Sequence, residues 1–242
     1  KVTLFGSLAR GAKSGGFQLA DSDLQSGAAV SSFETAFTNT VEAGFRASVF
    51  DDRLGLSGSL FFNDTKDEHV QVFDFATFQS VIENIDTATY GLELEAAFQA
   101  PPNLRLEGAL ALLETDITSS DDPTVATGNE VPFAPDMSVS LAAQYEDDLR
   151  IAGLDGVFSA RVEYQFVGGR TVDPQNRLDL DSYGIFDLRI GWDAGDVEVF
   201  GFVDNVFDNR FADSAFVFGA DPTGGVVAVA TPGAPRRIGI GV

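Results

Sequence analysis

"GVFSARVEYQF", residues 156–166, alternates apolar and polar side chains without a break from Phe158 onward. Successive side chains of a β-strand point to opposite faces, so this segment is predicted to be a strand with one apolar and one charged face. The apolar positions are Phe158, Ala160, Val162, Tyr164 and Phe166, and the polar positions are Ser159, Arg161, Glu163 and Gln165. What covers the apolar face decides the class of protein.

Composition excludes several classes. The chain has 242 residues and a formal net charge of −22, a balance that repels phosphate backbones and argues against a nucleic-acid partner. No apolar run approaches the roughly 18 residues of a transmembrane helix. Cysteine is absent, which removes disulfides and thiolate metal sites.

Alternating segments recur along the whole chain, and no stretch shows sustained helical periodicity. They run to about 10–14 residues, whereas strands of soluble domains cluster near 5–6 residues and a tilted strand needs about 9–11 to cross a bilayer. The sequence predicts strands at 1–10, 38–50, 53–65, 80–99, 103–117, 136–147, 156–167, 182–193, 196–207 and 234–242.

The connections alternate between short and long. The short ones are 51–53, 101–103 and 193–196, with 147–156 somewhat longer, and the long ones are 11–37, 66–79, 118–135, 168–181 and 208–233. Outer-membrane barrels combine short periplasmic turns with longer extracellular loops in this way. The prediction is an all-β, antiparallel transmembrane β-barrel with about ten strands present, its apolar faces turned to lipid.

Aromatic residues near the strand ends suit the two girdles of such a barrel, although a sandwich core would also hold aromatics. The residues are Phe50, Phe61, Phe62, Tyr145, Phe166, Tyr183, Trp192 and Phe207.

Several motifs carry a resemblance to a family. "VEVFGFVDNVFDNRF" (197–211) resembles the penultimate-strand signature of TonB-dependent outer-membrane receptors, in which N-[LV]-F-D-x-x-[YF] follows an alternating strand. "APRRIGIGV" (234–242) resembles the last strand of that family, and "GSLARGAKSGGFQ" (6–18) is similar to one of its strand-and-loop motifs. The order and spacing of the motifs extend the resemblance over essentially the whole chain.

The resemblance implies that residues 1–242 are the C-terminal portion of a larger, 22-stranded barrel. The family's N-terminal plug and TonB-contacting box have no room among these residues. The whole protein would lie in the Gram-negative outer membrane, contact lipid and lipopolysaccharide, and import a scarce small-molecule nutrient such as a ferric siderophore, driven by the TonB complex through the region outside this chain.

No catalytic site, metal site or cofactor is expected. The single histidine, His69, falls in the long 66–79 connection with no marked nucleophile beside it, and is interpreted as an exposed loop residue. Acidic pairs at Asp21/Asp23, Asp121/Asp122 and Asp179/Asp181 could hold Ca²⁺ or bridge lipopolysaccharide, but their spacing is not that of an EF-hand, and solvated loop charge is favoured.

Charged residues on the polar faces are the candidate functional residues, either as the hydrated wall of the lumen or as a structural salt-bridge ladder; substrate-binding residues cannot be named. Like charges directly opposite each other destabilise a sheet, so the register of 156–167 and 182–193 is predicted to place Arg161 opposite Asp187 or Glu163 opposite Arg189. The candidate lumen-lining charges are Arg105, Glu107, Arg161, Glu163, Asp187 and Arg189.

Two other classes stay open at this point. A small passive outer-membrane porin would share the strand pattern but would lack a plug and a coupling box. A soluble β-sandwich adhesin would bury Phe158, Val162 and Leu188 beneath a second sheet and would purify without detergent.

Overall fold

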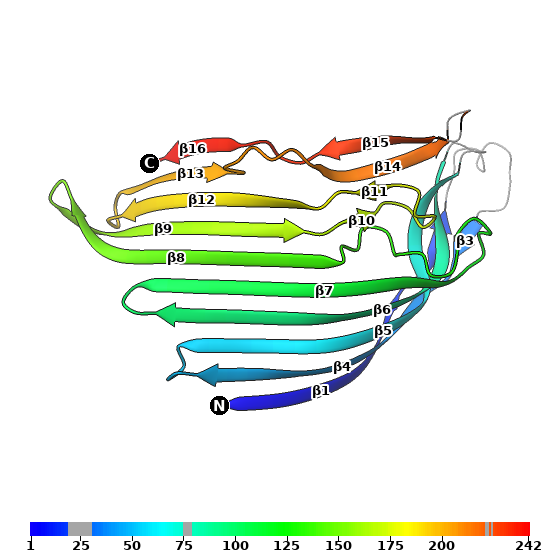
Figure 1. Ribbon diagram of the computed structural model, residues 1–242, viewed down its shortest axis with the longest axis horizontal. Coiled ribbons are helices and arrows are strands. Elements are labelled where there is room, and N and C mark those ends of the chain that lie inside the picture. Colours follow the sequence, from blue (N-terminus) through cyan, green and yellow to red (C-terminus); the bar gives the residue numbers. More distant parts are fainter. Residues whose placement is uncertain (19–30, 75–78, 221–222, 224) are drawn as a thin grey trace.

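The computed structural model describes residues 1–18, 31–74, 79–220, 223 and 225–242. Ten strands form one antiparallel sheet in the order β1-β4-β5-β6-β7-β8-β9-β12-β13-β16, with β1 and β16 at its edges (Figure 1). The strands are β1 Val2–Lys13, β4 Ala36–Val49, β5 Leu54–Asp74, β6 Gln79–Ala100, β7 Leu104–Ser120, β8 Met137–Ile151, β9 Leu154–Val167, β12 Tyr183–Asp193, β13 Glu198–Asp204 and β16 Arg237–Gly241.

Three two-stranded hairpins are inserted between these strands, and Figure 1 shows them toward one end of the sheet. This is the end of the long connections, here called the loop end; the opposite end carries the tight turns and is called the turn end. The hairpins pair β2 Gly16–Gln18 with β3 Ser31–Phe33, β10 Arg170–Thr171 with β11 Asp179–Leu180, and β14 Ala212–Ala220 with β15 Val226–Pro232.

The register joins the apolar positions into continuous rows. Val162 pairs with Ala143 on β8 and with Leu188 on β12, and the row runs on across the sheet. It continues through Leu106, Phe98, Leu54 and Val49 on one side and through Val203 and Ile238 on the other. A long antiparallel sheet with one wholly apolar face is what the alternation predicted.

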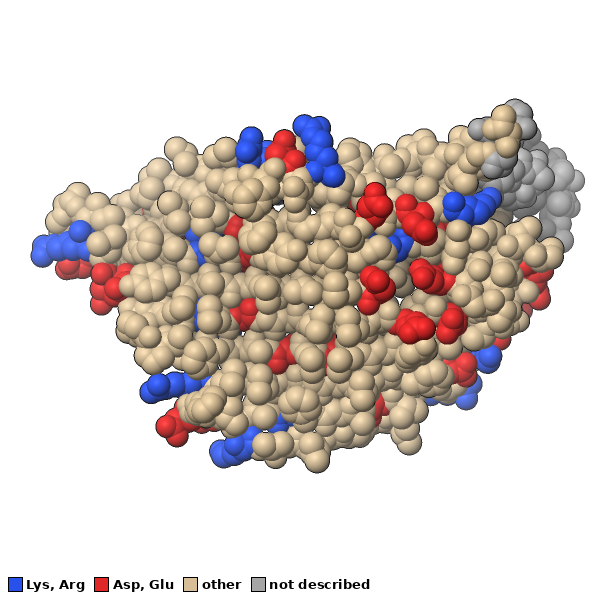
Figure 2. All heavy atoms as spheres, in the orientation of Figure 1, with Lys and Arg blue, Asp and Glu red and all other residues tan. Residues whose placement is uncertain are grey.

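No second layer covers this apolar face in the described part of the chain. Val162 and Leu188 are 43% and 37% exposed, so the stacked sheet that a sandwich requires is absent among these residues. Figure 2 shows the middle of the sheet largely free of surface charge, with acidic side chains gathered toward the loop end. Among the described residues no helix has the length and hydropathy to cross a membrane.

Two of the aromatic residues assigned to the girdles, Phe61 and Tyr183, lie on the other face; Tyr183 shares the parity of Asp187 and Arg189 on β12. Phe61 follows the parity of the polar side, and its ring lies against Gly91 of β6, where a Cβ would come within 2.7 Å of the ring and 2.5 Å of the Leu112 carbonyl oxygen. The girdle prediction is wrong for Phe61 and Tyr183. Glycine is needed at position 91 because the backbones and this ring approach too closely for a side chain.

The strands extend farther toward the loop end than the sequence indicated. The 66–79 connection was predicted as a loop, but β5 continues to Asp74 and β6 begins at Gln79, with a bulge between Thr65 and Glu68. Charged residues interrupt the apolar alternation in this segment. The strands nevertheless continue, because backbone hydrogen bonds between them do not require an apolar face. His69 is therefore a half-buried strand residue rather than an exposed loop residue, with Nε2 2.7 Å from the Glu34 carbonyl oxygen.

The 147–156 connection is also mostly strand. β8 and β9 remain paired to Ile151 and Leu154, and Ala152 and Gly153 make the turn with φ of 52° and 88°. The hairpin extends beyond the neighbouring turns, as Figure 1 shows.

Buried apolar clusters lie at the loop end rather than on the sheet faces. One contains Ile85, Ile117 and Val125, which joins the connection after β7 to the extended parts of β6 and β7. The other comprises Val172, Leu180, Ala215 and Val217 and joins the β10–β11 hairpin to β14. The connections at this end are thus packed against the wall and against one another.

Candidate functional site

The six charged residues singled out from the sequence lie on the polar face of three strands, β7, β9 and β12, arranged in rows of like charge. Arg105 pairs with Gln144, Gln144 with Arg161, and Arg161 with Arg189. Two residues along each strand, Glu107 and Glu163 both pair with Ala142, and Glu163 pairs with Asp187. A row of three cations thus runs beside a row of three carboxylates.

The predicted register between β9 and β12 is wrong. Arg161 lies opposite Arg189, and Glu163 lies opposite Asp187. Compensation comes from residues two positions away along the strand or from another strand, because the arginine side chain is long enough to reach them. Arg161 forms ion pairs with Glu163 at 2.6 Å and with Glu107 at 3.3 Å, and Arg105 pairs with Glu107 at 2.6 Å.

The β12 charges have different contacts. The carboxylate of Asp187 accepts the backbone N–H of Asn205 at 2.8 Å, and the guanidinium of Arg189 lies 4.9 Å from the centre of the Phe200 ring. These contacts stabilise the carboxylate and the guanidinium, although neither has an opposite charge directly across from it on β9.

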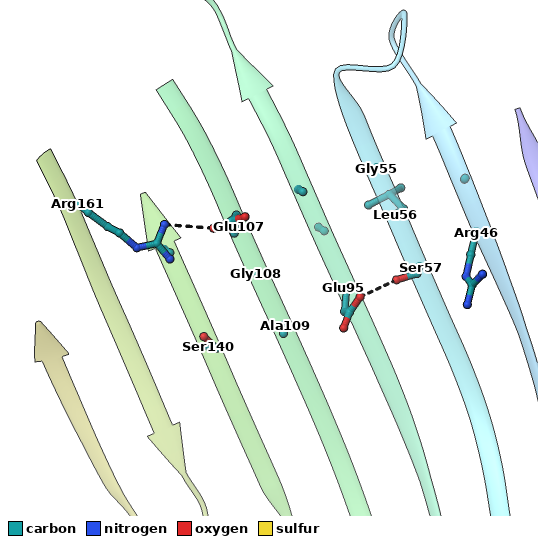
Figure 3. Close-up of a pocket in the computed structure, with 14 residues that line it drawn as sticks. Arg46, Gly55, Leu56, Ser57, Glu95, Glu107, Gly108, Ala109, Ser140 and Arg161 are labelled. Atoms are coloured by element: carbon teal, nitrogen blue, oxygen red, sulfur yellow. Dashed lines mark hydrogen bonds and ion pairs between the residues drawn. The ribbon is translucent and has the colours of Figure 1, made fainter. Parts of the chain in front are cut away.

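Two of the hollows on this polar face are lined in part by the six charged residues. The first, of about 420 Å³, is lined in its middle by small residues such as Gly55, Ala109 and Ser140, with Arg46 and Arg161 toward its two sides (Figure 3). Figure 3 also shows the bond from Ser57 Oγ to Glu95, 3.1 Å long. The second hollow, of about 480 Å³, is lined by Arg161, Glu163, Asp187, Arg189, Asp204 and Arg237.

A third hollow lies at the loop end. It measures about 530 Å³ and is bounded by the connection after β7, the β10–β11 region, β14 and the ends of β5 and β6. Its lining mixes apolar groups, including Phe133 and Val172, with the charged side chains of Asp122, Asp173 and Arg177. Such a mixture of apolar walls and a few polar groups is typical of small-molecule sites. It is called the loop-end pocket below.

Asp122 holds the polar side of the loop-end pocket together. Its carboxylate accepts hydrogen bonds from the Thr124 backbone N–H and hydroxyl, both 2.8 Å, and from Gln175 Nε2 at 3.1 Å. Burial raises the pKa of Asp122, but these hydrogen bonds and the nearby Arg177 outweigh it, so that the pKa lies below its ordinary value. The carboxylate therefore remains charged and links two connections that are far apart in the sequence.

Sequence reasoning named only Asp122 among the residues that line the loop-end pocket. Four of the long connections expected from the sequence, 66–79, 118–135, 168–181 and 208–233, supply part of the lining. The acidic pair Asp121/Asp122 was noted as loop charge, and the Asp-Pro-Thr run at 122–124 is the local signal that could have indicated a hydrogen-bonded turn. Asp21 and Asp23 lie outside the described residues.

The motif at 205–211 forms a structural clamp at the end of β13. Asn205 is 4% exposed; its Nδ2 donates to the carbonyls of Asn209 at 2.9 Å and Ala234 at 3.0 Å, while its Oδ1 accepts the Asn209 N–H at 2.9 Å. Asp208 Oδ1 accepts the Arg236 N–H at 3.0 Å. These bonds tie β13 to the segment leading into β16.

The two-faced antiparallel sheet, with rows of charge on one side and uncovered apolar rows on the other, is the wall of a transmembrane β-barrel. The sequence matches the family described as "TonB dependent receptor-like, beta-barrel" over residues 1–206, and the chain belongs to that family. Proteins of this family lie in the Gram-negative outer membrane.

Known relatives agree with this assignment. The chain is 26% identical over 201 residues to the pesticin receptor of Yersinia pestis, a match that covers 82% of this chain and 28% of the relative. It is 27% identical over 177 residues to the metal-pseudopaline receptor CntO of Pseudomonas aeruginosa, covering 72% and 24%. The chain thus spans about a quarter of the length of these relatives.

Solved structures share the fold. The ferric yersiniabactin uptake receptor FyuA from Yersinia pestis superposes with a TM-score of 0.80 at 23% identity, over 99% of this chain and 34% of that one. The ferric preacinetobactin receptor BauA from Acinetobacter baumannii gives a TM-score of 0.68 at 15% identity. All the relatives named here are receptors rather than enzymes.

Proposed function

We propose that the whole protein is a TonB-dependent receptor that imports a scarce nutrient across the outer membrane, with a metal chelate such as a ferric siderophore as its ligand. The observation that carries the proposal is the family match over 1–206, on a sheet whose two faces differ as a barrel wall requires. The names of a metal-pseudopaline receptor and a ferric yersiniabactin uptake receptor among the similar proteins support the ligand class.

In this proposal residues 1–242 form the C-terminal portion of the barrel, and the rest of the whole protein supplies the other strands, a plug and the contact with TonB. The relatives are long enough for this, since the match covers only 28% of the pesticin receptor. The unpaired outer sides of β1 and β16 are where further strands would add, because a barrel in lipid must close.

The two faces have different surroundings. The polar face, with Arg105, Glu107, Arg161, Glu163, Asp187 and Arg189, lines the hydrated lumen. The apolar face contacts membrane lipid, including lipopolysaccharide in the outer leaflet. The loop end faces the outside of the cell, where the loop-end pocket contributes to ligand capture by connections held on a rigid wall.

Measurements of ligand affinity on the whole protein test whether the loop-end pocket takes part in ligand capture. Phe133 is 47% exposed in the pocket lining, so Phe133→Ala should weaken binding of the transported ferric chelate by about tenfold, the loss expected for a truncated aromatic contact. Phe17→Ala, on the β2–β3 hairpin and outside the pocket lining, is the matched control and should leave the affinity unchanged. Equal affinities for both variants would remove the pocket from the proposal.

A requirement for energy coupling distinguishes a TonB-dependent receptor from a passive porin. A strain that lacks the whole gene should lose growth on one member of a panel of iron-loaded siderophores, and the gene should restore it only in the presence of TonB. Uptake that persists without TonB, or with a dissipated proton gradient, would favour the small passive porin. Growth unchanged on the whole panel would contradict the proposed ligand class.

A further inference from the structure

The β8–β9 hairpin extends past both neighbouring strands at the turn end. β7 accompanies β8 only as far as Tyr145, with one further bond from the Glu146 N–H to the Asn103 carbonyl. β12 accompanies β9 only to Val157, so residues 147–156 form a two-stranded ribbon, here called the tip. Figure 1 shows this ribbon extending beyond the other turns.

The tip keeps the two-faced character of the sheet. Leu149, Ile151 and Leu154 continue the parity of the apolar rows and are 43%, 43% and 49% exposed. The opposite side carries Asp148 and an ion pair between Arg150 and Asp155 at 3.4 Å. Asp147 lies on the same side as Leu149 at the base of the tip, where it accepts a hydrogen bond from the Tyr145 hydroxyl at 2.8 Å, and the side is aliphatic from Leu149 outward. A ribbon surrounded by water on both sides would have no reason to place these three aliphatic residues on one side.

The tip is fixed to the sheet by the only tryptophan of the chain. Trp192 of β12 is 9% exposed, and its Nε1 donates to the Leu149 carbonyl at 2.8 Å. The indole ring crosses β9 at Gly156, where a Cβ would lie 2.7 Å from it. The base of the tip, at Leu149 and Gly156, is therefore held in line with the apolar face, whereas the ribbon beyond it has no neighbouring strand on either side.

We propose that Leu149, Ile151 and Leu154 form a lipid anchor that lies in the headgroup region of the periplasmic leaflet. The inference rests on the proposed contact between the apolar face and lipid, because the argument for this occupant is that the patch continues that face. The turn end faces the periplasm in barrels of this kind.

The length of the tip suits this position. From Tyr145 to Ile151 the strand advances about 20 Å, and a tilt of about 40° reduces the rise along the membrane normal to about 15 Å. The headgroup region on each side is about 5–8 Å thick, so a modest outward bend of the ribbon brings the aliphatic residues to it. Two-stranded ribbons twist and bend more readily than wide sheets.

The test uses single-cysteine labels in the whole protein; residues 1–242 contain no cysteine, and any cysteine elsewhere in the whole protein is first replaced by serine. An environment-sensitive NBD label is attached to Ile151→Cys at the tip, to Asp148→Cys on its charged side as a matched control, and to Val162→Cys in the middle of the apolar face. Leu154→Cys serves as a second tip variant. Each labelled protein is placed in phosphatidylcholine vesicles with or without bromine on the acyl chains.

Brominated chains should reduce NBD fluorescence at Ile151→Cys and Leu154→Cys roughly twofold, because an interfacial segment lies about 5–10 Å into the boundary of headgroups and acyl chains. Asp148→Cys should be unaffected and should remain accessible to iodide in the water. Quenching at Val162→Cys but not at the tip would overturn the anchor and leave the proposed function intact. A tip label protected from both bromine and iodide would indicate a protein partner or a second copy and would equally overturn it. No quenching at Val162→Cys would remove the lipid contact on which the anchor rests.

Discussion

Asn205 shows how a single side chain can organise the edge of the sheet. It adopts a φ of 50°, a conformation that asparagine tolerates better than most residues, and its amide bonds to the backbone on both sides of a long insertion. The motif at 205–211 is therefore explained by backbone hydrogen bonds rather than by contact with a ligand.

Replacement of Asn205 by alanine should lower the free energy of unfolding by about 1–3 kcal/mol, because it leaves three partly buried backbone groups without their partner. The measurement is urea unfolding of the whole protein in detergent micelles. Asn103→Ala, in a tight turn where the backbone carbonyl rather than the side chain is used, is the control and should change stability little. Equal effects of the two variants would contradict the clamp.

Asp122 gives the loop end a dependence on pH. Its pKa in the folded protein lies below the ordinary value of 3.8, so its stabilising contribution is complete above that value and is lost as the pH falls through the lower, folded pKa. We expect the protection factor for hydrogen exchange at the Thr124 amide, which corrects the exchange rate for its intrinsic pH dependence, to fall over this acidic range. In Asp122→Asn the extra pH dependence should disappear, and a variant that retains it would show that another group titrates.

At the scale of elements, the positions of the strands were predictable from the sequence, but the register between neighbouring strands was not. The alternation at 156–166 indicates a strand because its period is a local property, and β9 forms there. The register of β9 and β12 was predicted wrongly because it was judged from charges directly across the pair, whereas Arg161 reaches Glu107 on β7, two strands away. The loop-end pocket depends on contacts such as Gln175 with Asp122, which no local pattern reveals.

The rows of like charge predict unequal effects at the two facing arginines. Arg161→Ala removes the partner of both Glu107 and Glu163 and should lower the free energy of unfolding by about 1 kcal/mol, near the upper end for partly exposed ion pairs. Arg189→Ala, which makes no ion pair within the described residues, should change it by less than about 0.5 kcal/mol. The urea midpoints of unfolding of the two variants test this prediction. A larger loss of stability in Arg189→Ala than in Arg161→Ala would contradict the assigned ion pairs.

At the scale of the whole molecule, the sheet is a single layer with two open edges. Its buried clusters lie only at the loop end among the described residues, so the strands themselves are stabilised by backbone pairing and by what surrounds the two faces. Unpaired backbone groups cost several kcal/mol each in hydrocarbon, which makes the outer sides of β1 and β16 the least favourable parts of the structure.

Residues 1–242 expressed alone should therefore associate through these edges. We expect light scattering in detergent to show oligomers whose size grows with protein concentration, while the whole protein remains a discrete species. A monodisperse monomer of residues 1–242 with full strand content would show that the two edges meet each other.

The paired rows of charge on the polar face also limit how far their electric field extends. Cations and carboxylates alternate about 7 Å apart along the strands, a spacing similar to the screening length of about 8 Å at physiological ionic strength. At greater distances the opposite potentials cancel, so a solute in mid-channel experiences little net attraction, and only a group that touches the wall can sense the sign of its charges.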